Sequence, residues 1–255
     1  TIAFTLKYLG GLLNIRPGEW KVVFLLQFQV FLIIGVLLLA KPAGNAVFLA
    51  RFGPDLLPYM YILTAIVAGV ISVSYAAALR RYSLLRVNLW SMGISLLTLL
   101  CFALLTPQSL MREVVAIGLY LWVALFGVLA ASQFWMMANM VFDVRQAKRL
   151  FGPIGAGAIA GGIVGGYAAN LVAGAFGVQV LLLTAVIALV PVIFISIYVW
   201  RNYLLEEPGR DTRRQPADTP SKRPHQLIVK SKHLMLLCGI IVLSVITAKL
   251  VDYQF

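Results

Sequence analysis

The chain has 255 residues, of which 61% are apolar and only 12% are charged, and its formal net charge is +12. Soluble domains carry about 25% charged residues, so this composition excludes an ordinary soluble protein and indicates a polytopic, all-α membrane protein. Most of the basic residues lie between apolar runs. Basic residues placed between spans indicate which loops are cytoplasmic. The positive charge is therefore not taken as a sign of a nucleic-acid partner.

The amino-terminal segment differs from the runs that follow it. Residues 1 to 19 place apolar side chains at helical spacing ahead of the breaker Arg16-Pro17-Gly18. This pattern predicts an amphipathic helix that lies at the membrane surface.

Six apolar runs follow, each near the length of about 20 residues that crosses the hydrocarbon core. Pro42 is expected to kink or end the first run, and a short turn around Phe176 and Gly177 is expected to separate the last two. The fourth run is longer than the minimum and should tilt or project into water. The runs are residues 20 to 40, 56 to 79, 87 to 105, 114 to 142, 153 to 174 and 178 to 200.

Residues 202 to 232 are rich in proline and basic side chains, which predicts a flexible polar linker. The linker would join a first domain, residues 1 to 201, to residues 233 to 255, the first helix of a second, truncated bundle. A six-helix bundle plus a seventh helix is half of a twelve-helix transporter of the major facilitator type. Because the chain lacks an initial methionine and stops just past an apolar run, we expect a fragment of a longer protein, which could carry attached soluble domains.

The distribution of Lys and Arg predicts the orientation. Seventeen of them lie in the amino-terminal segment, after the second and fourth spans, and in the linker, whereas the opposite side holds only Lys41, Arg51 and Arg112. By the positive-inside rule, the amino terminus and the linker are cytoplasmic. A bacterial inner (plasma) membrane is the expected location.

The fifth span carries Gly157, Gly161 and Gly165 at intervals of four residues. On a helix this spacing makes a stripe without side chains, which lets a neighbouring backbone approach closely in lipid. A nucleotide-binding loop is the alternative, but it needs a preceding strand and the spacing G-x-G-x-x-G. The sequence therefore favours helix packing.

Acidic residues are scarce, and no two share a span or lie beside a histidine within the membrane. An enzyme, a metal site and a bound cofactor are therefore not expected. Ionisable residues within or next to spans are candidates for a substrate path. For Lys41 the alternative is snorkelling at a helix end, and for Asp252 it is pairing with Lys249.

The fourth span adds further candidates for the path: Gln133, Trp135 and Asn139. These side chains could equally be bundle core, because polar residues often bond between membrane helices. The charged hinge after this span, residues 143 to 149, has two interpretations: a cytoplasmic gate, or an electrostatic funnel for an anionic solute. Its charged residues are Asp143, Arg145, Lys148 and Arg149.

Three segments carry a family resemblance: Phe134–Asn139 (FWMMAN), Gln146–Phe151 (QAKRLF) before the glycine-rich helix, and Lys249–Phe255 (KLVDYQF). In these segments the chain resembles the ATP/ADP translocases of plastids and intracellular bacteria and their free-living bacterial relatives. The resemblance implies a major facilitator fold in the lipid bilayer and exchange of ATP and ADP, or of a related small organic anion.

Two positions depart from the family pattern. A basic and acidic pair after the first span, which the family uses toward the nucleotide, is replaced by Gly44-Asn45, with Lys41 as the nearest cation. Asn45 is therefore a further candidate for the substrate path. A glutamate of the fourth span is replaced by an apolar residue near Val123, whereas the acid of the seventh span is kept as Asp252. The alternative to a transporter is therefore a membrane anchor or regulatory module that derives from a transporter fold and does not transport.

Overall fold

The computed structural model describes the chain except at residues 1–14, 17, 106–111, 205–234, 237–238 and 248–255. Its contacts divide the chain into two units, Thr1–Glu206 and Glu207–Phe255. In the second unit, residues 239–247 are helical. Most of the amphipathic segment, nearly all of the linker, and both Lys249 and Asp252 lie outside the described residues.

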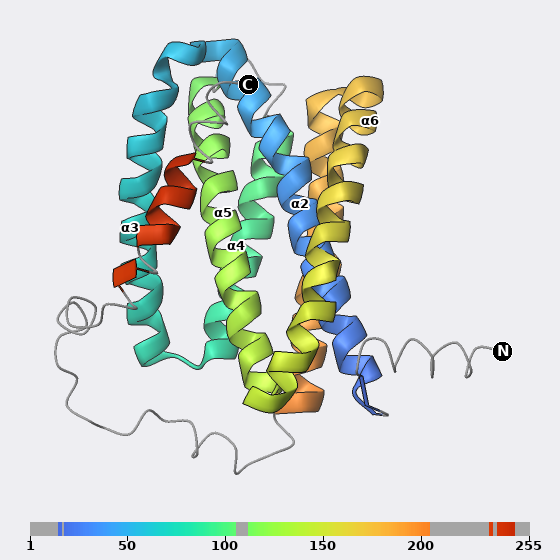
Figure 1. Cartoon of the computed structure of the whole chain (residues 1–255). Coiled ribbons are helices and arrows are strands. Elements are labelled where there is room, and N and C mark those ends of the chain that lie inside the picture. Colours follow the sequence, from blue (N-terminus) through green and yellow to red (C-terminus); the bar gives the residue numbers. More distant parts are fainter. Residues whose placement is uncertain (1–14, 17, 106–111, 205–234, 237–238, 248–255) are drawn as a thin grey trace. The chain divides into compact units, whose positions relative to one another are not determined.

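The described part of the first unit is built of helices alone, which confirms the all-α membrane class (Figure 1). Among the described residues, five helices are long and apolar enough to cross a membrane, so the protein is an integral, multi-pass membrane protein. In chain order the elements are α2 (Trp20–Phe52), the 3-10 turn η1 (Pro54–Leu56), α3 (Leu57–Arg81), α4 (Leu84–Leu105), α5 (Arg112–Val141), α6 (Val144–Val199) and the π-helical turn η3 (Trp200–Leu204).

The long element α6 consists of two spans. Gly177 interrupts it with φ 80° and ψ 179°, a conformation that glycine adopts without steric cost. The two parts of α6, yellow and orange in Figure 1, lie side by side, so the chain reverses direction between them. The turn expected around Phe176 and Gly177 is therefore present.

The prediction that the first span ends near Pro42 was wrong. The helix α2 continues through Pro42 as far as Phe52. Proline removes one backbone hydrogen bond from a helix, but Ala43, Gly44 and Phe48 just beyond it are buried, and this packing stabilises the continued helix. Lys41 consequently lies inside α2 and not at a helix end.

The fifth span also begins earlier than predicted. The helix α6 starts at Val144, so the charged hinge forms its first turns and Pro153 lies within it. Asp143 and Gln146 make a capping box, in which Gln146 Oε1 accepts a hydrogen bond from the Asp143 backbone N–H at 3.1 Å. Because of this reciprocal capping, the helix begins at Val144, ahead of the apolar run that was predicted to begin it.

The helix α2 packs most extensively on α6 and next on α5. The glycine stripe of α6 is buried at this contact, and a Cβ atom at Gly161 would lie 2.9 Å from Phe31 Cα of α2. Cβ atoms at Gly157 and Gly165 would likewise overlap α2. The positions that they meet repeat with the same interval of four residues: Gln27, Phe31 and Gly35. Only glycine therefore fits where the two backbones meet.

The helix α3 lies at the edge of the bundle, with Met60 as its one buried residue. It packs on α4 and α5 and leaves most of its apolar surface exposed. That surface suits contact with lipid or with another part of a larger bundle.

Candidate functional site

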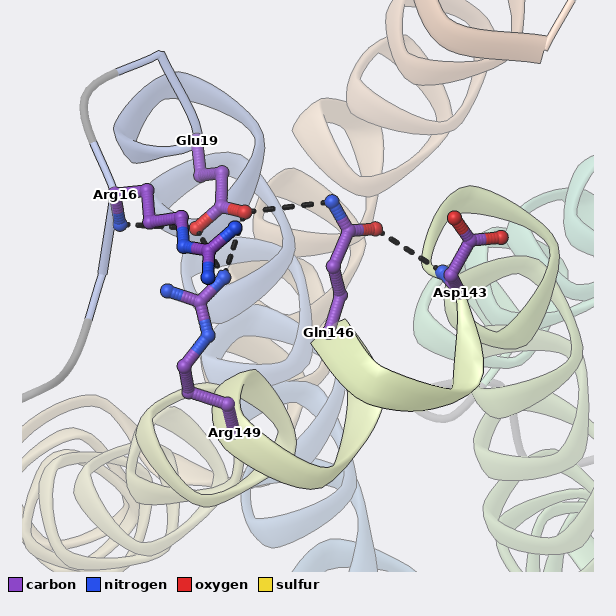
Figure 2. A network of polar contacts seen from close by, with 5 residues as sticks. All are labelled: Arg16, Glu19, Asp143, Gln146 and Arg149. Atoms are coloured by element: carbon purple, nitrogen blue, oxygen red, sulfur yellow. Dashed lines mark hydrogen bonds and ion pairs between the residues drawn. The ribbon is translucent and has the colours of Figure 1, made fainter.

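A partly buried ion pair joins the start of α2 to the start of α6 (Figure 2). The guanidinium of Arg149 donates to both carboxylate oxygens of Glu19, at 2.7 Å and 2.8 Å. The side chain of Gln146 donates to the same carboxylate at 3.3 Å, and the backbone N–H of Arg16 does so at 2.9 Å. Both charged side chains are only 15% exposed. Glu19 is thus the centre of a network that holds three segments together.

The surroundings of Glu19 favour its charged form. Burial alone would raise the pKa of the carboxyl, but the hydrogen bond from the Arg16 backbone and the hydrogen bond and charge of Arg149 outweigh it and lower the pKa below the ordinary value. Glu19 is therefore ionised at neutral pH, and its pair with Arg149 is complete.

The four residues proposed as a cytoplasmic gate separate into two groups. Arg149 turns inward to Glu19, and Asp143 caps α6. Arg145 and Lys148 are exposed on the first turns of α6. Of these four residues, only Arg145 and Lys148 therefore present a cation to solvent at the start of α6.

Sequence reasoning did not single out Glu19. A signal was present, because Glu19 is the only acidic residue before Asp55 and stands in a basic segment. Its partner Arg149 lies 130 positions away, however, so no local pattern could identify the pair.

Gln133, a candidate for the path, is a core residue. Its side chain is 2% exposed, and Nε2 donates to Ser91 Oγ of α4 at 2.7 Å. This bond ties α5 to α4, as polar residues between membrane helices commonly do.

Trp135 and Asn139 lie one turn apart near the end of α5. The ring of Trp135 packs edge-on against Phe151 of α6, with centroids 5.2 Å apart, and also against Phe134. The amide of Asn139 donates to the backbone oxygen of Trp135 at 2.8 Å, and its side chain is exposed. Aromatic packing thus occupies part of Trp135, whereas Asn139 faces outward.

Lys41 and Asn45 are partly buried on α2, and Gly44 between them meets α5. A Cβ atom at Gly44 would lie 3.4 Å from Val123 Cγ2. The two positions that depart from the family pattern therefore touch each other, and their contact is apolar.

The described candidates fall at two levels of the bundle. Leu37 of α2 meets Gly127 of α5, and Gly44 meets Val123, so the two helices run antiparallel. Trp135 lies twelve residues beyond Val123, which is about 18 Å along a helix at about 1.5 Å per residue. Lys41 and Asn45 therefore do not meet Trp135 and Asn139 within the first unit.

A cavity of about 610 Å³ lies among α3, α4 and α5, and its walls are mostly apolar and aromatic. Trp122 Nε1 donates to Thr98 Oγ1 at 2.9 Å in the wall. Arg86 is the one charged side chain among the described residues that line it. None of the path candidates that the structure describes lines this cavity, and a single cation does not suit a multiply charged anion.

Comparisons with known proteins place the chain in one family. A search of curated proteins and a search of solved structures each gave no match. The family model described as TLC ATP/ADP transporter matches residues 117–255, just over half of the chain. The matched range includes the charged hinge, the glycine stripe and Asp252, whereas Lys41 and Asn45 lie before it. The chain therefore belongs to the TLC ATP/ADP transporter family.

Proposed function

We propose that this chain forms part of a secondary transporter that exchanges adenine nucleotides, or a related organic anion, by alternating access. The family match over residues 117–255 carries the proposal. The membrane-length helices support it, because a nucleotide with several negative charges needs a protein path through hydrocarbon.

The substrate path is proposed to lie on the surface where the first bundle meets a second one. In transporters built of two halves, the site lies near the midplane between them. The outward-facing Asn139 and the partly buried Lys41 and Asn45 suit that place better than the apolar cavity does. Lys249 and Asp252, in the seventh span, are proposed to complete the path.

The contact between Gly44 and Val123 leaves no charged side chain at that position of α2, so a cation from α2 has to come from another residue. Neither residue is charged, and they pack closely. Lys41 lies almost one turn before Gly44 on the same helix. Lys41 is therefore proposed as the cation that α2 offers to the substrate.

Exchange is tested with full-length protein in liposomes that contain ADP and are offered labelled ATP. We expect uptake above that of empty liposomes, and we expect Lys41→Gln to lower it by roughly tenfold or more, because a hydrogen bond to a charged group contributes about 1.5 to 3 kcal/mol. Arg51→Gln is the matched control, since Arg51 is an exposed cation ten residues further along α2. Asp252→Asn should impair exchange more than expression.

Uptake equal to that of empty liposomes, for nucleoside diphosphates, triphosphates and phosphate, would reject the transporter. The membrane anchor or regulatory module would then be the better account. Equal loss in Lys41→Gln and Arg51→Gln would reject the specific role of Lys41.

Orientation is tested with single cysteines at the two ends of α3. Asp55 and Ser83 are both exposed and flank this helix. In a background without Cys101 and Cys238, an impermeant thiol reagent applied to intact cells should label Asp55→Cys. Ser83→Cys should react only after the cells are permeabilised, and the reverse pattern would place the amino terminus outside.

A further inference from the structure

A groove lies between the start of α2 and the end of α6, at the end of the first unit that holds the network of Figure 2. Its volume is about 800 Å³. Apolar and aromatic side chains of both helices form its walls, among them Phe24 and Phe194. Lys21, Arg201 and Asn202 form its polar end. The groove is thus apolar along its length and basic at one end.

The two cations of this groove have no ion pair among the described residues. Lys21 lies in the first turn of α2, and Arg201 lies in the π-helical turn η3. Both are exposed. Trp200 is buried in the core, while the two residues after it line the groove. Two segments far apart in the sequence therefore bring positive charge to one place, where no carboxylate of the described part of the chain pairs with it.

The cations also mark the membrane boundary. No charged residue occurs from Val22 to Ala40, or from Leu150 to Trp200. Lys21 and Arg201 are the first charges beyond these apolar runs, where basic residues meet the lipid head groups. Tyr198, which also lines the groove, is half exposed, as is usual for tyrosine at a membrane interface.

The aromatic walls of the groove are exposed at the surface of the first unit. Phe24 is 64% exposed and Phe194 is 66% exposed. A water-soluble anion would neutralise the cations but would leave these rings uncovered. An occupant with an anionic head and apolar chains satisfies both parts of the groove.

We propose that this groove binds an anionic phospholipid. Its phosphate lies between Lys21 and Arg201, the amide of Asn202 donates to a head-group oxygen, and an acyl chain covers Phe24 and Phe194. Because the groove is separate from the residues of the substrate path, the site is independent of the transport proposal.

The test measures thermal unfolding of the full chain in detergent during titration with phosphatidylglycerol or with phosphatidylcholine of the same acyl chains. We expect phosphatidylglycerol to stabilise the protein and phosphatidylcholine to have little effect. The double variant Lys21→Gln/Arg201→Gln should bind phosphatidylglycerol about 30-fold more weakly. The double variant Arg80→Gln/Arg81→Gln removes two exposed cations outside the groove and should keep the wild-type affinity.

Two further arms separate the possible outcomes. Arg201→Lys keeps the charge and should retain most of the affinity, which distinguishes lost binding from a folding defect. Glycerol phosphate and inorganic phosphate test a free anion as the source of the phosphate. Equal stabilisation by these soluble anions and by phosphatidylglycerol would overturn the proposal. Equal affinity for the two lipids, or unchanged affinity in the Lys21→Gln/Arg201→Gln variant, would also overturn it.

Discussion

Gly161→Ala is expected to destabilise the protein, whereas Gly166→Ala, five residues further along α6, is expected to be neutral or slightly stabilising. The new Cβ atom at Gly161 would lie 2.9 Å from Phe31 Cα and closer still to the Phe31 backbone oxygen. Backbone atoms of a packed helix cannot move aside as a flexible side chain can. Overpacking of this kind costs about 1 to 3 kcal/mol.

Gly166 is the matched control on the same helix. A Cβ atom there would meet no heavy atom within 4 Å. Without a clash, the change from glycine to alanine favours the helix by about 0.5 to 1 kcal/mol.

Thermal unfolding of the purified variants in one detergent measures the difference. At roughly 2 to 4 °C per kcal/mol for a chain of this size, the two alanine variants should melt several degrees apart. Gly161→Leu, which adds four carbons, should be worse than Gly161→Ala. If Gly161→Ala melts at or above the temperature of Gly166→Ala, α2 does not lie against the glycine stripe.

Glu19→Gln is also expected to destabilise the protein strongly. The change leaves the largely buried guanidinium of Arg149 without its counter-ion. Removing one partner of a buried ion pair costs about 3 to 5 kcal/mol, and the remaining 15% exposure of both side chains favours the lower end. The double variant Glu19→Gln/Arg149→Gln should be less destabilised than the sum of the two single variants, because no charge is then unpaired.

The pair between Arg51 and Glu113 is the control for this prediction. It also joins two helices, α2 and α5, with a distance of 2.5 Å, but its side chains are 53% and 61% exposed. Exposed ion pairs contribute about 1 kcal/mol or less, so Glu113→Gln should change the melting temperature little. Equal effects of Glu19→Gln and Glu113→Gln would show that burial adds nothing to the first pair.

The pH dependence follows from the lowered pKa of Glu19. The ordinary value for a glutamate is 4.5, and the folded protein binds this proton more weakly than the unfolded chain does. The stability from ionised Glu19 is therefore fully present above about pH 4.5 and is lost as the pH falls through the lower folded pKa. The difference in melting temperature between wild type and Glu19→Gln should shrink at the acid end of a titration from pH 7 to about pH 3.5.

Several features of the fold could be read from local sequence. Long uncharged runs predicted the membrane helices, because a span needs about 20 apolar residues wherever its neighbours lie. Phe176 and Gly177 predicted the turn within α6, since glycine tolerates the positive φ found there. The helix ends predicted at Pro42 and Pro153 were wrong, because both prolines lie inside helices. Packing beyond Pro42 keeps α2 helical, and the capping box at Asp143 starts α6 before Pro153. The hydropathy of an apolar run does not predict either effect.

The candidate site was less predictable. Charge and polarity singled out Gln133 and Arg149, but polarity alone cannot tell a path from a core. In the structure Gln133 bonds to Ser91, and Arg149 bonds to Glu19. Both partners lie on other segments, so only their placement in space showed which charges remain available to a solute.

By itself the sequence determined the class of the protein, its membrane segments and the helix that carries the glycine stripe. These properties depend on the composition and periodicity of single segments, which act within one or two helical turns. Only the tertiary structure decided that the stripe meets Phe31, that Gly44 meets Val123 and that Glu19 pairs with Arg149. Such contacts depend on which helix faces another and at what height, and those choices result from packing the whole bundle at once.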